Sequence, residues 1–167
     1  MKYQRLSKEQ LEELHVEFIN FLATQSITSE EWQEIKSKRP EVAEEEIDVF
    51  SDLVWEKVLT NAEYLEHFST NQIHLFKLEE NQMQLIAIKV NNDIDITTKE
   101  GYSWLQNNLI SDEVVFYNAS KEYGEDKNLD KFEIIRKGAN ITNGQLFIYF
   151  DKLVTPCLLY TSDAADD

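Results

Sequence analysis

Cysteine is almost missing from this chain of 167 residues, because the only one is Cys157, close to the C-terminus. A single thiol forms no intrachain disulfide bond and no multi-thiolate metal site. Glycine is scarce as well, and its four copies are spaced too widely for a phosphate-binding loop or a dinucleotide-binding fingerprint. The sequence also lacks a Gly-x-Ser-x-Gly motif, so it offers no assignable nucleophile. These absences disfavour an enzyme and predict no cofactor.

Basic residues are also few in comparison with acidic ones. The chain has 32 acidic residues against 16 lysines and arginines, a net charge of −16. Such a field repels the phosphates of nucleic acids and anionic lipids. The densest basic cluster, Lys36 to Arg39, is followed directly by the acidic stretch from Glu41 to Asp48. We therefore expect neither a nucleic acid nor a membrane as partner.

Long hydrophobic runs are also missing. No stretch approaches the roughly 20 apolar residues that span a membrane, and none at the N-terminus has the length of a signal peptide. The hydrophobic content of 42% is nevertheless high enough for a packed core. These features predict a cytoplasmic globular protein.

The last eleven residues, CLLYTSDAADD, look foreign to the protein. One reading frame of a transposase sequencing adapter, TGT CTC TTA TAC ACA TCT GAC GCT GCC GAC, encodes them residue for residue through Asp166. They include the sole cysteine and three acids, and without them the net charge is −13. We therefore predict that residues 157–167 are a non-native tail and that residues 1–156 form a single domain.

Helix-start signals are frequent in the sequence. Capping boxes begin at Ser7, Thr28 and Thr142, each with a flanking pair of apolar residues. Together with apolar residues at helical spacing, they predict helices over residues 8–23, 29–38, 40–59, 128–137 and 143–154, and another that begins near Thr97. Residues 72–90 predict a β-hairpin. We therefore expect an α+β fold, one mostly helical domain packed on a small antiparallel hairpin.

The segment 111–127 is the exception, since its periodicity fades after a possible short strand over residues 114–117. An irregular loop of this length is uncommon in a compact domain and is often functional. Its aromatic, amide and cationic side chains are of types that favour partner recognition. The main functional hypothesis is therefore a non-enzymatic domain that binds another protein through Tyr117, Asn118, Ser120, Lys121, Tyr123 and Lys127.

Two alternative hypotheses come from other residues. Glu12 and His15 have the spacing with which a helix presents ligands to a di-metal centre, and Glu63 and His67 loosely supply a second pair. A metal-dependent enzyme built on these pairs is one alternative. The other is an acidic mimic in which Glu41 to Asp48 occupy a nucleic-acid-binding protein.

Five segments together resemble a family of small acidic bacterial proteins that is known only as a domain of unknown function. They are MKYQRLSKEQLEELHVEFINFLATQSIT, PEVAEEEIDVFSDLVWE, YLEHFSTNQIHLFKL, DITTKEGYSWLQ and NASKEYGEDKNLDKFEIIRKGANIT. The resemblance extends from Met1 to about Val154. It implies no catalytic or ligand-binding residue, because no such motif is established for the family.

Overall fold

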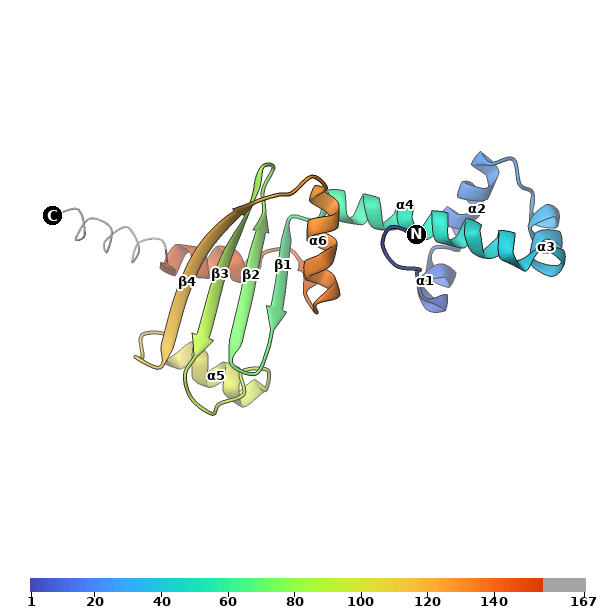
Figure 1. Cartoon of the computed structure of the whole chain (residues 1–167). Coiled ribbons are helices and arrows are strands. Elements are labelled where there is room, and N and C mark those ends of the chain that lie inside the picture. Colours follow the sequence, from blue (N-terminus) through green and yellow to red (C-terminus); the bar gives the residue numbers. More distant parts are fainter. Residues whose placement is uncertain (155–167) are drawn as a thin grey trace. The chain divides into compact units, whose positions relative to one another are not determined.

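The computed structural model describes residues 1–154, and it divides the chain into two compact units at Asn61. The first unit covers residues 1–61 and the second begins at Ala62 (Figure 1). The predicted non-native tail, residues 157–167, lies outside the described residues. That residues 1–156 form a single domain stays a prediction.

The first unit consists of four helices. They are α1 (Lys8–Glu13), α2 (His15–Thr24), α3 (Ser29–Lys38) and α4 (Pro40–Asn61). The capping box at Ser7 is present, and the Thr28 side chain caps α3. The prediction of one helix over residues 8–23 is wrong, because the backbone at Leu14, with φ −100° and ψ 23°, separates α1 from α2. The core of this unit includes Leu22, Trp32, Ile35 and Ala43.

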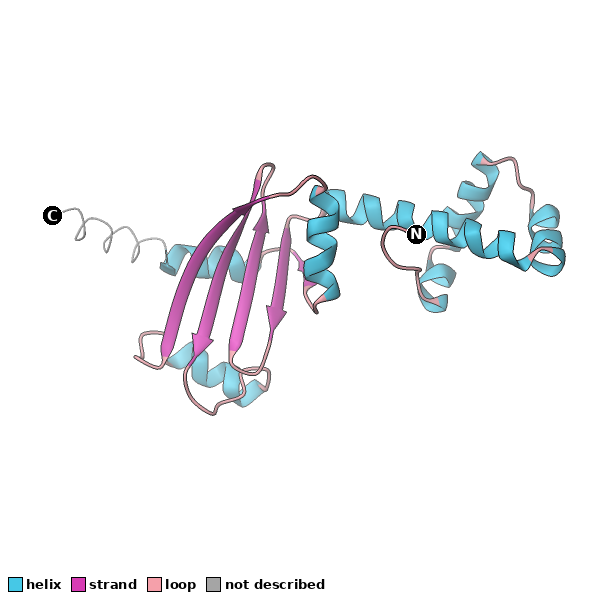
Figure 2. Cartoon of the chain, viewed as in Figure 1, coloured by secondary structure: helices cyan, strands magenta, loops and turns pink. Residues whose placement is uncertain are grey.

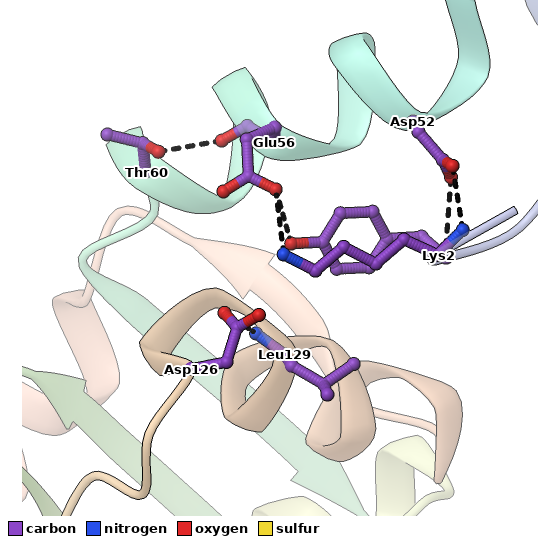
Figure 3. A network of polar contacts seen from close by, with 7 residues as sticks. Lys2, Asp52, Glu56, Thr60, Asp126 and Leu129 are labelled. Atoms are coloured by element: carbon purple, nitrogen blue, oxygen red, sulfur yellow. Dashed lines mark hydrogen bonds and ion pairs between the residues drawn. The ribbon is translucent and has the colours of Figure 1, made fainter. Parts of the chain in front are cut away.

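The N-terminal residues of this unit are fastened to α4 by hydrogen bonds. The backbone amides of Lys2 and Tyr3 donate to the Asp52 carboxylate over 2.7 and 2.9 Å (Figure 3). The Tyr3 hydroxyl donates to Glu56 Oε2 over 2.5 Å, and the Leu6 amide donates to the buried Ser51 hydroxyl. These hydrogen bonds give three backbone amides and the Tyr3 hydroxyl acceptors on α4.

The second unit is built on an antiparallel sheet of five strands. These are β1 (Tyr64–Phe68), β2 (Gln72–Leu78), β3 (Gln82–Val90), β4 (Val114–Glu122) and β5 (Asn140–Thr142), in the order β4-β3-β2-β1-β5 (Figure 2). The predicted hairpin is confirmed as β2 and β3. The α+β class is confirmed, but the description as a small hairpin sheet is wrong because three further strands extend it.

Three helices accompany the sheet: α5 (Lys99–Asn107), α6 (Lys127–Arg136) and a helix over residues 145–154. One sheet face, the core face, carries Ile73, Leu75, Ile86 and Ile88, which pack with Leu105 of α5 and with Phe147 and Phe150. Figure 1 shows α5 and the last helix behind the strands. No helix within residues 1–154 is both long and apolar enough to span a membrane.

The prediction of an irregular loop over residues 111–127 is wrong. Residues 114–122 form β4, which pairs with β3 from Val90↔Val114 to Gln82↔Glu122. All six residues from Tyr117 to Glu122 are exposed, so no buried face imposes the alternation of apolar and polar residues that identifies a strand. The backbone pairing with β3 therefore defines this strand, and its side-chain pattern does not.

Candidate functional site

The face of the sheet opposite the core face carries a cleft. We call it the cleft face; it includes Leu65, His67, His74, Phe76 and Leu85, as the strand register requires. Helix α6 covers one part of it, where Ile134 and Ile135 pack with Leu65, Leu78 and Met83. Beside this contact lies a cleft of about 730 Å³, a volume typical of ligand pockets. Its lining combines apolar and charged side chains: His67, His74, Phe76, Met83, Leu85, Ala119, Ser120, Lys121, Asp130, Glu133, Ile134 and Lys137.

Two histidines stand side by side at one end of the cleft. His67 of β1 and His74 of β2 are direct cross-strand partners, with ring centroids 6.5 Å apart. His74 Nε2 donates to Gln72 Oε1 over 2.9 Å. Burial, and then the neighbouring His67 imidazole, lower the pKa of His74. The uncharged form of His74 is therefore favoured, and its ring offers a hydrogen-bonding group at the edge of an apolar floor.

Gly138 makes the position of the His67 ring possible. This glycine follows α6 with φ +121°, and a Cβ atom built on it would lie 3.0 Å from His67 Nε2. Because Lys137 precedes Gly138, the Lys137 backbone lies at the histidine end of the cleft. At the other end of α6, Lys127 Nζ donates to the Glu80 carbonyl in the β2–β3 turn. The helix therefore runs along the strands from the turn towards the histidine pair.

The carboxylates of the cleft have partners within the described chain, whereas two of its lysine amines have no carboxylate close to them there. Asp130 Oδ2 accepts the Gly124 amide over 2.7 Å, and Glu133 Oε2 lies 2.6 Å from the Arg136 guanidinium. Among the described residues, no carboxylate lies within 4.0 Å of the amines of Lys121 or Lys137. The cleft thus has two engaged carboxylates and two cations that form no ion pair with residues 1–154, in a chain whose net charge is −16.

The outer side of β4 is the second feature of this unit. In the strand order, β4 is a terminal strand, so only one of its sides is paired with a neighbour within the described sheet. At nine residues it equals β3 as the longest strand in residues 1–154. An unpaired strand edge presents backbone donors and acceptors that another extended chain can use.

The six residues predicted for partner binding separate into two groups. Tyr117 and Lys121 lie on the cleft face of β4, while Asn118 and Ser120 alternate with them on the core face. All four are exposed, and Tyr117 has 53% of its surface accessible. They share the strand, and Ser120 and Lys121 also line the cleft.

Tyr123 and Lys127 take part in internal contacts instead. The Tyr123 hydroxyl donates to the Glu79 carbonyl over 2.8 Å, and Lys127 Nζ lies 4.9 Å from the Tyr123 ring centroid. Burial, and then the nearby Glu79 and Asp130 carboxylates, raise the pKa of Tyr123 to about 12. These contacts fix the connection between β4 and α6 to the β2–β3 turn, which gives both side chains a structural role.

The candidate metal ligands do not form a cluster in the described residues. Glu63 immediately precedes β1 and His67 lies within it, and extended backbone separates residues four positions apart by about 13 Å. Glu12 and His15 belong to two helices, and His15 Nδ1 lies 3.2 Å from the Glu12 carbonyl oxygen. Within residues 1–154, no three His, Cys, Asp or Glu side chains are placed to hold one metal ion.

The acidic stretch from Glu41 to Asp48 lies on α4 and is partly neutralised. Arg5 Nε lies 2.6 Å from Asp48 Oδ1, and the same guanidinium is 3.6 Å from Glu44. The hydrogen bond from Arg5 lowers the pKa of Asp48. Two of these acids therefore form an internal ion-pair group.

Sequence reasoning missed the histidine pair because it did not identify β1. The available signal was the alternation in Tyr64-Leu65-Glu66-His67-Phe68, followed by the polar turn Ser69-Thr70-Asn71. With that strand paired to the predicted hairpin, His67 and His74 become cross-strand neighbours.

The comparisons with known proteins agree with the resemblance seen in the sequence. The model of a family described as "Family of unknown function (DUF6495)" matches residues 1–155, so the chain belongs to this family. No curated protein and no solved structure matches the chain.

Proposed function

We propose that this chain is a non-enzymatic protein-binding domain whose partner adds an extended segment to the outer side of β4. The observation that carries the proposal is the position of this nine-residue strand at the end of the sheet, with its last six residues exposed. Addition of a strand to a sheet edge is a common mode of peptide recognition, in which main-chain hydrogen bonds provide affinity and alternate side chains provide specificity.

The hydrogen bonds of the sheet determine which β4 backbone groups point outwards. The Asn91 amide donates to the Glu113 carbonyl over 2.7 Å, so this facing pair is a hydrogen-bonded one. In an antiparallel ladder, such pairs recur at every second residue. Residues 115, 117, 119 and 121 therefore direct their backbone groups to β3, and residues 116, 118, 120 and 122 direct theirs to the open side.

The side chains of β4 define the kind of segment that fits. On the cleft face, Tyr117 offers an exposed ring and Lys121 a cation without an ion pair among the described residues. On the core face, Asn118 and Ser120 offer neutral hydrogen-bonding groups. We therefore infer a partner strand with an apolar residue beside Tyr117 and an acidic residue four positions away, beside Lys121. The net charge of −16 disfavours a second copy of this chain as that partner.

A pair of substitutions at Ser120 tests the proposal at the level of one backbone amide. Ser120→Pro removes an outward N–H and leaves the ladder to β3 intact, whereas Ser120→Ala removes only the hydroxyl. The partner is first captured by a photoreactive residue placed at position 118, identified, and produced in pure form for measurement of Kd. We expect at least tenfold weaker binding for Ser120→Pro, because a lost hydrogen bond adds to the obstruction by the ring, and less than about threefold for Ser120→Ala.

Two further measurements make the result decisive. The thermal unfolding midpoint of Ser120→Pro should stay close to that of the wild-type chain, since the missing amide has no partner in the ladder. Tyr117→Ala should also weaken binding, whereas Tyr123→Phe should not. Unchanged affinity of the folded Ser120→Pro variant would show that the partner does not add a strand to β4.

A further inference from the structure

We infer that the cleft beside α6 is a binding site for a small organic anion, a carboxylate attached to an apolar body. This inference concerns the inside of the cleft and not the outer side of β4, although Ser120 and Lys121 of β4 also line the cleft. It depends on the volume, the apolar floor and the distribution of charge described above.

The floor of the cleft is apolar and lies between the two polar ends. Phe76 of β2 and Leu85 of β3 are direct cross-strand partners, both only partly buried, and Ala119 of β4 continues the same row. Ile134 of α6 provides the opposite wall. Water held against this surface is released when an apolar group covers it, at about 25 cal/mol for each Å² removed from water. The floor therefore favours an apolar ligand body.

The histidine end of the cleft is suited to the carboxylate. His67 presents its imidazole there, and the Lys137 backbone is adjacent because Gly138 packs against His67. His74 lies beside it but already donates its Nε2–H to Gln72. The Lys137 ammonium has no carboxylate within 4.0 Å among residues 1–154. A ligand carboxylate would give this amine the partner that the described chain does not supply.

The other charged groups of the cleft do not oppose this assignment. Asp130 and Glu133 line it, but the Gly124 amide and the Arg136 guanidinium already engage their oxygens. Lys121, at the β2–β3 turn end, contributes a second positive charge. On a chain with twice as many acids as bases, a cleft with this balance is a local exception that selects an anion.

Calorimetric titration with decanoate tests the inference, with decanol as the uncharged counterpart and inorganic phosphate as the counterpart without an apolar body. We expect one decanoate per chain, and weaker binding of both decanol and phosphate. Lys137→Gln should weaken decanoate binding about tenfold, as expected for loss of one charge-assisted hydrogen bond at a partly exposed position. Lys152→Gln makes the same change of net charge on the helix over residues 145–154, which packs on the core face, and should leave the affinity unchanged.

The three histidines of the chain allow the bound ligand to be located. Decanoate should shift the imidazole NMR signals of His67 and His74, and His15 should keep its signal because it lies on α2, outside the cleft. Equal affinity for decanoate and decanol, or equal effects of Lys137→Gln and Lys152→Gln, would overturn recognition of the charge. Phosphate binding as tight as decanoate would overturn the role of the apolar floor, and failure of decanoate to bind would overturn the site itself.

Discussion

Replacement of Gly144 by alanine should destabilise the second unit more than the addition of one methyl group suggests. Gly144 lies between β5 and the helix over residues 145–154, with φ +81°, a conformation that residues with a side chain rarely adopt. A Cβ atom at this position would lie 2.5 Å from Tyr64 Cγ and 2.6 Å from Tyr64 Cε2. The Tyr64 ring packs in turn on Phe147, with centroids 5.8 Å apart, within the core of the unit. The substitution therefore strains the backbone and displaces a ring from the core.

The two effects have separate magnitudes. The left-handed conformation costs an alanine about 1–2 kcal/mol relative to glycine. Displacement of a packed ring costs about 1–3 kcal/mol in a well-packed core. We expect Gly144→Ala to lower the free energy of unfolding by the sum, about 2–5 kcal/mol. In a Tyr64→Ala background the ring is gone, so the same change should cost only the backbone part, about 1–2 kcal/mol.

Gly124→Ala is the matched control. The nearest atom to a Cβ at Gly124 is Asp130 Oδ2 at 3.5 Å, an ordinary contact, and its φ is not in the left-handed region. This variant should stay within about 0.5 kcal/mol of the wild-type chain. Hydrogen exchange of β2 and β3 peptides across a urea titration reports the second unit separately. If Gly144→Ala proves as stable as Gly124→Ala, the assignment of strain and contact to Gly144 is wrong.

Two further predictions concern Tyr123 and Asp52. Because the folded-state pKa of Tyr123 is raised from 10.0 to about 12, its contribution to stability is complete below pH 10 and is lost as the pH rises towards 12. Tyr123→Phe should therefore reduce the alkaline loss of stability measured for the second unit, and an unchanged slope would contradict the assignment. Asp52→Ala should free the Lys2 and Tyr3 amides, at a cost of about 1–3 kcal/mol, whereas Asp151→Ala should leave both amides bonded to Asp52. Exchange rates of the Lys2 and Tyr3 amides measure this effect, and protection equal to that of the wild-type chain would exclude Asp52 as the anchor.

Local signals in the sequence were sufficient for the helices that have clear caps. The helix over residues 29–38 was predicted with the bounds of α3, because Thr28 supplies its cap and Pro40 prevents its continuation through the next turn. The first predicted helix failed at Leu14, where no glycine or proline marks the break. The hairpin was predictable because β2 and β3 are apolar and flank a polar turn.

The remaining strands depend on tertiary contacts that leave little trace in the sequence. From Tyr117 onwards, β4 is exposed on both faces, so its residues carry no hydrophobic period. Lys131 shows the opposite case, since this lysine is 2% exposed and its amine donates to the Ala62 carbonyl. A charged residue predicts a surface position, and burial of this amine is possible because it is paired with groups such as the Ala62 carbonyl.

The β4 strand also explains why the sequence predicted a loop where the structure has a strand; partner binding by this region stays a proposal. The same exposure that hides a strand from pattern analysis leaves its outer backbone groups available to another chain. The β4 edge and the adjoining cleft can serve two ligands that share only the neighbourhood of Lys121, because strand addition uses outward amides such as that of Ser120, and the anion uses Lys137 and His67. Substitutions at positions 120 and 137 should therefore act independently. The double variant should bind the protein partner as weakly as Ser120→Pro alone, and it should bind decanoate as weakly as Lys137→Gln alone.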